Sequence, residues 1–396
     1  MRGKLLIVIL LLLAMAGVVW LAQKRGAIVL PGTGPSTGGS TAVPSGSKVT
    51  VTVVFGTEKR DWIESAAESF RAKHPEVELK LVGQGSLESA QDILDGKSQP
   101  TVWAPADSLV LSLLESDWRT KNGTALFASG GEDAPAPLVI SPLVFVAWED
   151  RAEVLAKLGN GHITWKALQQ ALSADQGWPA IGGKGEWGFV KLGHTDPTRS
   201  NSGLQGLVSM TYEYYGKNQI AVADLLDPKY QAWVRSIERG VTRFEPSTGI
   251  FMTDMVRFGP SRYDIALVYE NLAVSQLENA QGRWGNLKLY YLPHTMWSDH
   301  PGALLQGSWV TEPQKKAARA WLQHLRSRPM QEAALRLGFR PADPAVPIKN
   351  QDGANPFNRL GPYGLQIDLP PASASPDGAV VRNLLSMWSR IVPRNP

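Results

Sequence analysis

The sequence predicts an α/β fold of two lobes, and three of its features carry this prediction. Apolar, β-branched runs alternate with amphipathic helical patterns between residues 49 and 114, an order typical of parallel βαβ units. Two extended apolar segments, 138–148 and 287–292, are each long enough to cross from one lobe to another. With 396 residues, 43% of them hydrophobic, the chain can bury a large core. Two crossings between lobes predict a cleft.

The first strands and helices are read from hydrophobic periodicity. Residues 49–55 form a β-branched run, and 77–82 alternate apolar with charged side chains, so both segments predict strands. Between them, residues 62–70 place apolar side chains on one helical face. Residues 100–103 predict a third strand, and 109–114 belong to another helix. Ligands of parallel sheets bind beyond the carboxyl ends of the strands, so the loops of interest begin at Gly56, Gly83 and Trp103.

Later elements follow from the same signals. Residues 264–269 form a short apolar run that predicts a buried strand, followed by the polar turn Glu270-Asn271. Residues 313–325 and 329–337 predict two helices, the second capped by Ser327 and stopped by Gly338.

The most distinctive loop is 193–203, which is polar, rich in turn signals and leads directly into an amphipathic helix that Gly216 ends. Ser200 or Ser202 can cap that helix. Free backbone N–H groups and hydroxyls at the positive end of a helix predict a binding site for a small, electron-rich ligand. The alternative is an ordinary capped loop without a ligand.

The N-terminus carries a targeting element. Arg2 and Lys4 precede an uninterrupted apolar run over residues 5–22. A helix of this length spans about 27 Å, close to the thickness of the hydrocarbon core of a bilayer. Residues 1–25 therefore predict a membrane anchor. The alternative is a cleaved signal peptide, because Ala14-Met15-Ala16 fits a peptidase site. Either way, the body is exported to the extracellular or periplasmic side of the cell membrane.

Composition also divides the chain. Residues 26–47 are dominated by Gly, Pro, Ser and Thr and predict a flexible linker. Lobe 1 is predicted over 48–142 together with 293–396, and lobe 2 over 143–292. Within the C-terminal part, residues 341–376 are rich in Pro but carry apolar side chains, which predicts an arm laid over a surface.

Charge and motifs exclude several functions. The formal net charge is only +4 and the basic residues are scattered, so nucleic-acid binding is disfavoured. There is no cysteine and no recognised catalytic motif, so we predict no enzyme, no catalytic residues, no cofactor and no metal site. His294, Asp299 and His300 form a loose cluster in one loop, which is weak evidence for a metal.

Several short segments share one order and spacing over about residues 49–345. They are 56–59 with Trp62, 100–108, Asp196-Pro197 with 200–203, 264–270 and 338–341. Together they resemble the bacterial extracellular solute-binding proteins of the two-lobe, two-crossover type, the group that includes molybdate, sulfate and iron binders. Position 101 is Thr where an acidic residue is more usual in that group.

The resemblance implies a type II periplasmic-binding-protein fold whose two α/β lobes close on a small molecule or ion. It implies capture for an ABC-type importer permease, or for another membrane partner; the alternative is a sensor or scaffold ectodomain that transports nothing. If Glu58, Asp107 and Glu270 all lined the cleft, they would favour a cation, an amine or a bound metal over an oxyanion. Carboxylates at such junctions are, however, often caps or ion-pair partners. The ligand-binding residues that the resemblance implies are Gly56, Thr57, Glu58, Ser86, Asp107, Ser108, Thr198, Ser200, Asn201, Ser202, Tyr269 and Glu270.

Overall fold

The structure is a computed structural model that describes residues 48–369 and 371–392. All of these residues belong to one compact unit of the chain, Ser47–Pro396. The predicted anchor or signal peptide (1–25) and the predicted linker (26–47) lie outside the described residues. Within the described part of the chain, no helix is both long and apolar enough to cross a bilayer.

A first sheet of five strands forms the core of one lobe, which we call lobe 1. Its strand order is β2-β1-β3-β10-β4. β1 pairs in parallel with β2 and β3, whereas β10 runs antiparallel to β3 and β4. The strands are β1 (Val49–Phe55), β2 (Val77–Gly83), β3 (Val102–Ala104), β4 (Ala136–Pro137) and β10 (Pro301–Leu304).

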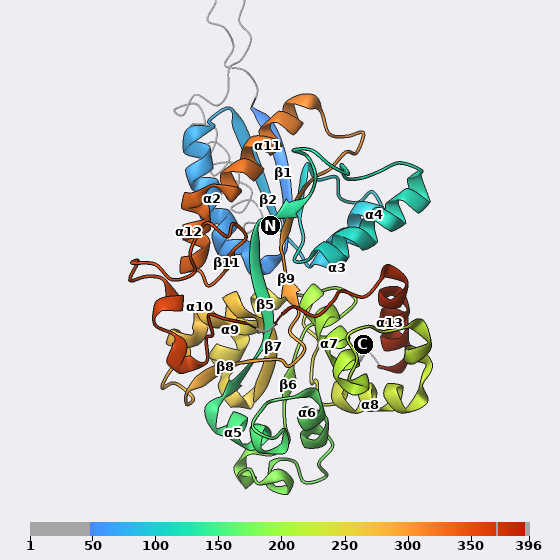
Figure 1. The fold of residues 1–396 in the computed structure, drawn as a ribbon, viewed down its shortest axis with the longest axis vertical. Coiled ribbons are helices and arrows are strands. Elements are labelled where there is room, and N and C mark those ends of the chain that lie inside the picture. Colours follow the sequence, from blue (N-terminus) through green and yellow to red (C-terminus); the bar gives the residue numbers. More distant parts are fainter. Residues whose placement is uncertain (1–47, 370, 393–396) are drawn as a thin grey trace, which may run out of the picture. The chain divides into compact units, whose positions relative to one another are not determined.

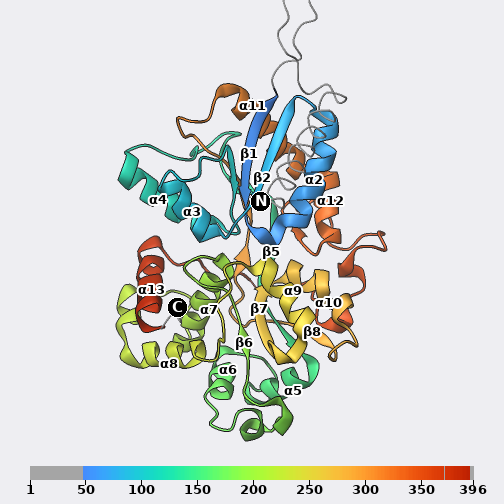
Figure 2. The same ribbon diagram turned by 180° about the vertical axis from the view of Figure 1, so that it is seen from behind.

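Helices cover both faces of this sheet, because β1 presents apolar side chains to either side. Val51 and Val53 pack into a cluster with Trp62 and Trp321, while Val54 packs into a cluster with Trp103 on the opposite face. Figures 1 and 2 show helices on both sides of the sheet. The first face carries α2 (Arg60–Lys73), α11 (Glu312–Arg326) and α12 (Arg328–Arg336), and the second carries α3 (Ser86–Leu94) and α4 (Ser108–Asn122).

A second sheet forms the core of the other lobe, lobe 2, around one long strand, β5. Figure 1 shows β5 running from the first sheet down into the second. It pairs antiparallel with β7, β8, β9 and β11, and β7 pairs in parallel with β6. The strands are β5 (Val139–Trp148), β6 (Leu192–Gly193), β7 (Ile265–Tyr269), β8 (Leu287–Tyr291), β9 (Trp297–Ser298) and β11 (Arg340–Pro341).

The second sheet is also covered on both faces. Alternate residues of β5 separate the two cores, so that Val144 and Val146 pack with α9 and α10 while Phe145 packs with α6 and α7. The helices are α5 (Glu149–Leu158), α6 (Trp165–Leu172), α7 (Asn201–Tyr215), α8 (Pro228–Glu238), α9 (Thr248–Phe258) and α10 (Glu270–Ala280). Short 3₁₀ turns are η1 (Thr57–Lys59), η2 (Trp178–Ile181), η3 (Gly185–Trp187), η4 (Val222–Leu226), η5 (Gly259–Ser261), η6 (Pro356–Asn358) and η7 (Gly361–Tyr363).

Most predicted elements occur where their periodicity placed them, with three differences of detail. The third strand begins at Val102 and not at residue 100, since Pro100 has no N–H to donate to a ladder. The predicted crossing over 287–292 is instead β8, which stays in the second sheet beside β5. The chain returns to the first sheet through β9 and β10.

The C-terminal segment follows a different course from the predicted one. After β11, the chain continues to α13 (Gly378–Ile391), which packs against η4 and α8 of lobe 2 as well as α4 of lobe 1. The Trp388 indole donates to Glu238 Oε1 on α8 at 2.8 Å. The predicted boundaries placed all of 293–396 in lobe 1. They miss this packing because the arm before α13 crosses lobe 2, where Tyr212 donates to Ala374 O.

Candidate functional site

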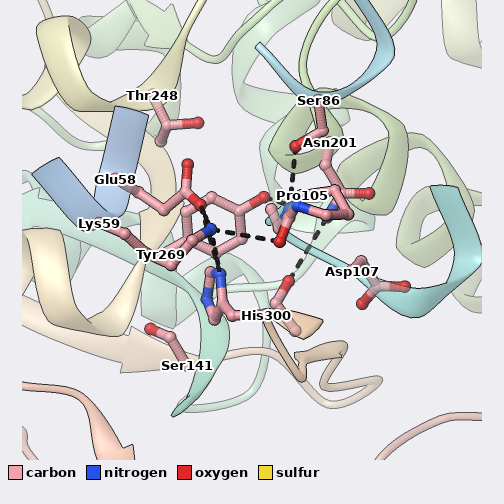
Figure 3. Close-up of polar contacts among 12 residues, drawn as sticks. Glu58, Lys59, Ser86, Pro105, Asp107, Ser141, Asn201, Thr248, Tyr269 and His300 are labelled. Carbon is pink, nitrogen blue, oxygen red and sulfur yellow. Dashed lines mark hydrogen bonds and ion pairs between the residues drawn. The ribbon is translucent and has the colours of Figure 1, made fainter. Parts of the chain in front are cut away.

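Polar side chains gather where the two lobes meet, although the surrounding structure is apolar. Figure 3 shows the centre of this group. Each of its members is less than a tenth exposed. Burying so many polar groups is costly unless they are paired or serve a ligand. The group comprises Glu58, Lys59, Ser86 and Asp107 from lobe 1, Asn201, Gln205, Thr248 and Tyr269 from lobe 2, and Ser298 and His300 from the returning segment.

A fully buried ion pair occupies one side of the group. Lys59 Nζ lies 2.5 Å from Glu58 Oε1, and it also contacts Pro105 O and His300 Nδ1 at 3.2 Å each. Burial opposes the ionisation of Glu58, but the charge of Lys59 and the hydrogen bond with His300 hold its pKa at about 2. Burial and the charge of Lys59 lower the pKa of His300 to about 4, so this imidazole is neutral at pH 7. The cation and the anion of the pair neutralise each other.

Asp107 connects the two lobes from the start of α4. Its Oδ1 accepts from the N–H of Leu109 at 2.7 Å, as an N-cap does. Its Oδ2 faces Nε2 of Gln205 on α7, in the other lobe, at 2.9 Å. Burial and the nearby Asp299 raise the pKa of Asp107 to about 8. Asp107 therefore lies between the lobes, as predicted. It also caps a helix, which was the alternative role for the predicted carboxylates.

The start of α7 is a helix N-terminus without a side-chain cap. Ser200 occupies the N-cap position, as expected, but its hydroxyl makes no capping hydrogen bond. The hydroxyls of Ser200 and Ser202 turn toward Thr248 Oγ1, at 3.3 and 2.5 Å, and Ser202 also contacts Thr195 Oγ1. The first N–H groups of α7 therefore lack the usual side-chain acceptor, which leaves the positive end of the helix dipole facing this region.

Backbone contacts between the lobes surround the polar group. The N–H groups of Leu87 and Glu88, in the first turn of α3, both donate to Arg199 O of lobe 2 at 3.2 Å. Gly85 makes this approach possible, because a Cβ at that position would lie 2.7 Å from Arg199 O and 3.2 Å from Pro246 O. A Cβ at Gly249 would likewise lie 2.9 Å from Thr57 O. The structure thus has its lobes in direct contact.

Not all predicted residues join the central group. Gly56 and Thr57 border it, the first against the Glu58 carboxylate and the second against Gly249. Ser108 donates to the Asp299 carboxylate, and Thr198 donates to Asp196 Oδ1 within its own turn.

The structure does not bring the Glu270 side chain into the central group. Its two oxygens accept from Arg340 at 2.7 and 2.8 Å, and Tyr291 donates to it as well. Glu270 therefore forms an ion pair with Arg340, which was the alternative to ligand binding for this carboxylate.

Five members of the group were not predicted as site residues: Lys59, Gln205, Thr248, Ser298 and His300. Two of them carry a signal in the sequence, because Lys59 follows Glu58 in the same turn and Gln205 lies one helical turn after Asn201. His300 was noted in the sequence only as part of the loose cluster with His294 and Asp299, and Thr248 and Ser298 come from segments without a motif. Only the tertiary structure brings these three residues here.

Two hollows between the lobes flank the buried group. One, of about 240 Å³, is lined by Thr57 and Glu58 of lobe 1 and by Gly249 and Thr253 of lobe 2. The other, of about 390 Å³, lies between α3 and α4 on one side and Arg199 on the other. Among residues 48–369 and 371–392, no group of three or more His, Asp or Glu side chains is arranged to hold a metal ion.

The raised pKa of Asp107 predicts an unusual pH dependence of stability. Between its ordinary value of 3.8 and about 8, the folded protein holds a proton that the unfolded chain releases, so rising pH reduces this group's contribution to stability. Asp107→Asn removes that dependence. We expect the free energy of unfolding of the wild type to fall relative to the variant by at least about 1.4 kcal/mol between pH 5 and pH 8. Urea unfolding at both pH values measures it, and parallel pH profiles would contradict the prediction.

Comparisons with known proteins agree with this architecture. The family model described as bacterial extracellular solute-binding protein matches residues 51–340. A periplasmic thiamin binding protein is 18% identical with a TM-score of 0.59, covering 91% of this chain and 100% of its own. The sulfate-binding protein SubI from Mycobacterium tuberculosis H37Rv is 16% identical with a TM-score of 0.53, covering 86% of this chain and 97% of its own.

A third structure, the periplasmic binding protein AfuA from Actinobacillus pleuropneumoniae, is 15% identical with a TM-score of 0.56, covering 87% of this chain and 99% of its own. At such identities these likenesses concern the fold alone. No curated protein matches the chain at a significant level. The family match spans most of the chain and includes both sheets and the segments that meet between them. The chain therefore belongs to the family of bacterial extracellular solute-binding proteins.

Proposed function

We propose that this protein captures a small solute between its two lobes and delivers it to an ABC-type importer. The observation that carries the proposal is the buried polar group itself, to which both lobes contribute side chains. The hydrogen bond between Gln205 and Asp107, and those from Leu87 and Glu88 to Arg199, all require the lobes to be together. A solute held by both lobes stabilises that arrangement, and closure is then what a membrane partner recognises.

The site favours a solute rich in hydrogen-bond acceptors over a cation. The charge of Glu58 is already matched by Lys59, and Glu270 is bound by Arg340 elsewhere. The third carboxyl group that would have favoured a cation, Asp107, is bonded by Leu109 N–H and Gln205 Nε2. All three are therefore engaged. The N-terminus of α7, which has no side-chain cap, offers backbone N–H donors instead. Similar structures are named for thiamin and for sulfate, and one holds fructose-6-phosphate, so the fold alone selects no ligand.

The N-terminal segment supports a location on the cell membrane with the body outside it. Residues 5–22 are apolar and long enough to span a bilayer, and 26–47 have the composition of a flexible tether. An anchor would keep the binding body near its permease without restricting its orientation. Mass spectrometry of the mature N-terminus distinguishes the two fates, since cleavage after Ala16 would remove the anchor.

A thermal-shift screen tests the proposed capture directly. Oxyanions, sugars, amines and divalent cations are added to the purified full-length protein. A solute present at 100 times its Kd is expected to stabilise the folded state by about 2.7 kcal/mol. Failure of every class to change the melting temperature would count against solute capture and would favour the scaffold alternative.

A double substitution then locates the site. Ser200→Ala with Ser202→Ala removes two hydroxyls at the start of α7, and the affinity for a solute found in the screen is expected to fall at least tenfold. The matched control is Ser112→Ala with Ser116→Ala, two exposed serines of α4. Calorimetric titration measures both. Equal affinities of the two double variants would place the solute elsewhere.

A further inference from the structure

The side chain of Asn201 ends in a buried oxygen without a hydrogen-bond partner. Asn201 is 1% exposed, and its Nδ2 donates to the hydroxyl of Tyr269 at 3.0 Å and to Ser298 Oγ at 3.4 Å. Its Oδ1 is fully enclosed and accepts from no group in the described part of the chain. Buried acceptors are almost always paired, and an unpaired one at a binding site indicates a donor that arrives with the ligand.

Neighbouring side chains fix the orientation of this amide. Above the pKa of about 8 that burial gives Asp107, its carboxylate is ionised and accepts from Gln205 Nε2, which leaves Gln205 Oε1 to accept from the hydroxyl of Ser298 at 3.2 Å. A hydroxyl has one hydrogen, so Ser298 can only accept from Asn201. The nitrogen of Asn201 must therefore point to Ser298, and its oxygen is the atom left unpaired.

Donors lie beside this acceptor. The Tyr269 hydroxyl accepts from Asn201 and is also hydrogen-bonded with Ser298, and burial raises its pKa well above 10, so it stays protonated. Asn201 is also the first residue of α7, whose N-terminus has no side-chain cap. The same few atoms thus present several donors and one acceptor. The donors suit an anion, whereas the acceptor is unfavourable for an anion that has no hydrogen.

We propose that the captured solute is an oxyanion that retains a hydrogen at neutral pH, of the class of hydrogenphosphate and hydrogenarsenate. Its O–H donates to Asn201 Oδ1, while its charged oxygens accept from the first N–H groups of α7. This inference rests on the proposed capture of a solute between the lobes. It assigns to Asn201 the selection against sulfate and molybdate, which have a similar shape and charge but no hydrogen to donate.

Calorimetric titration of the full-length protein in detergent tests the inference. The four anions are compared at fixed ionic strength and at pH 8.5, above the pKa of Asp107, so that the carboxylate accepts from Gln205. Hydrogenphosphate or hydrogenarsenate is expected to bind at least tenfold more tightly than sulfate and molybdate, which corresponds to about 1.4 kcal/mol. Equal binding, or tighter binding of sulfate or molybdate, would overturn the inference.

Substitution of Asn201 separates selectivity from a merely structural role. In Asn201→Ala, or in Asn201→Ser if the first variant does not fold, the ratio of affinities between the hydrogen-bearing anions and sulfate or molybdate is expected to shrink to within threefold. If Asn201 had only a structural role, the variant would bind all four anions equally more weakly and keep the same ratio of affinities. That result would overturn the assignment of selectivity to Asn201. The matched control is Gln281→Ala, because Gln281 Oε1 is also buried and unpaired but lies outside the polar group. Its preference is expected to equal that of the wild type.

The thermal-shift screen distinguishes failure of the proposed oxyanion selectivity from failure of the proposed solute capture. If none of the four anions binds but another solute raises the melting temperature, the inference fails and solute capture stands. If no solute of any class has an effect, both fail.

Discussion

Gly85→Ala is expected to hold the two lobes apart and to weaken solute binding by on the order of a hundredfold, about 2.7 kcal/mol. Gly85 has a φ of −59°, so alanine fits its backbone conformation. The obstacle is the other lobe, since the new Cβ would lie 2.7 Å from the carbonyl oxygen of Arg199. Relieving that clash moves Arg199 O away from the N–H groups of Leu87 and Glu88. These N–H groups donate to Arg199 O when the lobes are together. Each lobe should still fold normally.

Small-angle X-ray scattering of the variant, with and without solute, measures this effect. We expect a larger radius of gyration than that of the wild type and no compaction on adding solute. The matched control is Gly83→Ala at the end of β2. Its Cβ would meet only the guanidinium end of Arg60, whose side chain is half exposed and free to move. A Gly85→Ala protein as compact as the Gly83→Ala protein would show that the contact with Arg199 does not control closure.

Lys59→Met is expected to destabilise the fold by about 3–5 kcal/mol, because it leaves the Glu58 carboxylate buried without its counter-charge. Methionine preserves the length and the apolar part of the side chain, so the loss is mainly electrostatic. The Glu58 pKa of about 2 depends on Lys59 and should rise in the variant. Urea unfolding at pH 7 measures the change in the free energy of unfolding.

A double variant and an exposed pair serve as controls. Adding Glu58→Gln to Lys59→Met removes the unpaired charge, and the double variant is expected to recover at least half of the lost stability. Lys97→Met breaks the pair with Asp95, in which the lysine side chain is 67% exposed, and should cost less than about 1 kcal/mol. If Lys59→Met costs no more than Lys97→Met, the buried pair does not stabilise the structure.

The strands and helices illustrate what local sequence signals can predict. β1 and β2 were readable because apolar residues alternate or dominate over seven positions, and the end of α7 because Gly216 adopts a φ of 59° that favours glycine. The segment 287–292 was misassigned as a crossing since its pattern indicates an extended strand but not its partner. Only pairing with β5 shows that it remains in the second sheet.

The site was predictable to the extent that it follows strand ends. Glu58, Ser86, Asp107, Asn201 and Tyr269 lie near the ends of strands or the starts of helices, where a parallel sheet is known to place ligand loops. Glu270 obeys the same rule, yet its side chain turns to Arg340, 70 residues further along the chain. A residue's position at a strand end determines where its backbone lies. Which group its side chain contacts depends on the elements that pack beside it.

The sequence by itself determined the α/β class and the family, because those properties depend on periodicity and on short segments. The tertiary structure decided which charges remain available there. It paired Glu58 with Lys59 and His300, turned the Ser200 and Ser202 hydroxyls toward Thr248, and left Asn201 Oδ1 without a donor. Apart from the Glu58–Lys59 pair of adjacent residues, these contacts join residues far apart in the chain, such as 46 positions for Ser202 and Thr248 and 241 positions for Lys59 and His300. Such separations leave no periodic trace in the sequence, so only the folded chain fixes the chemistry of the candidate site.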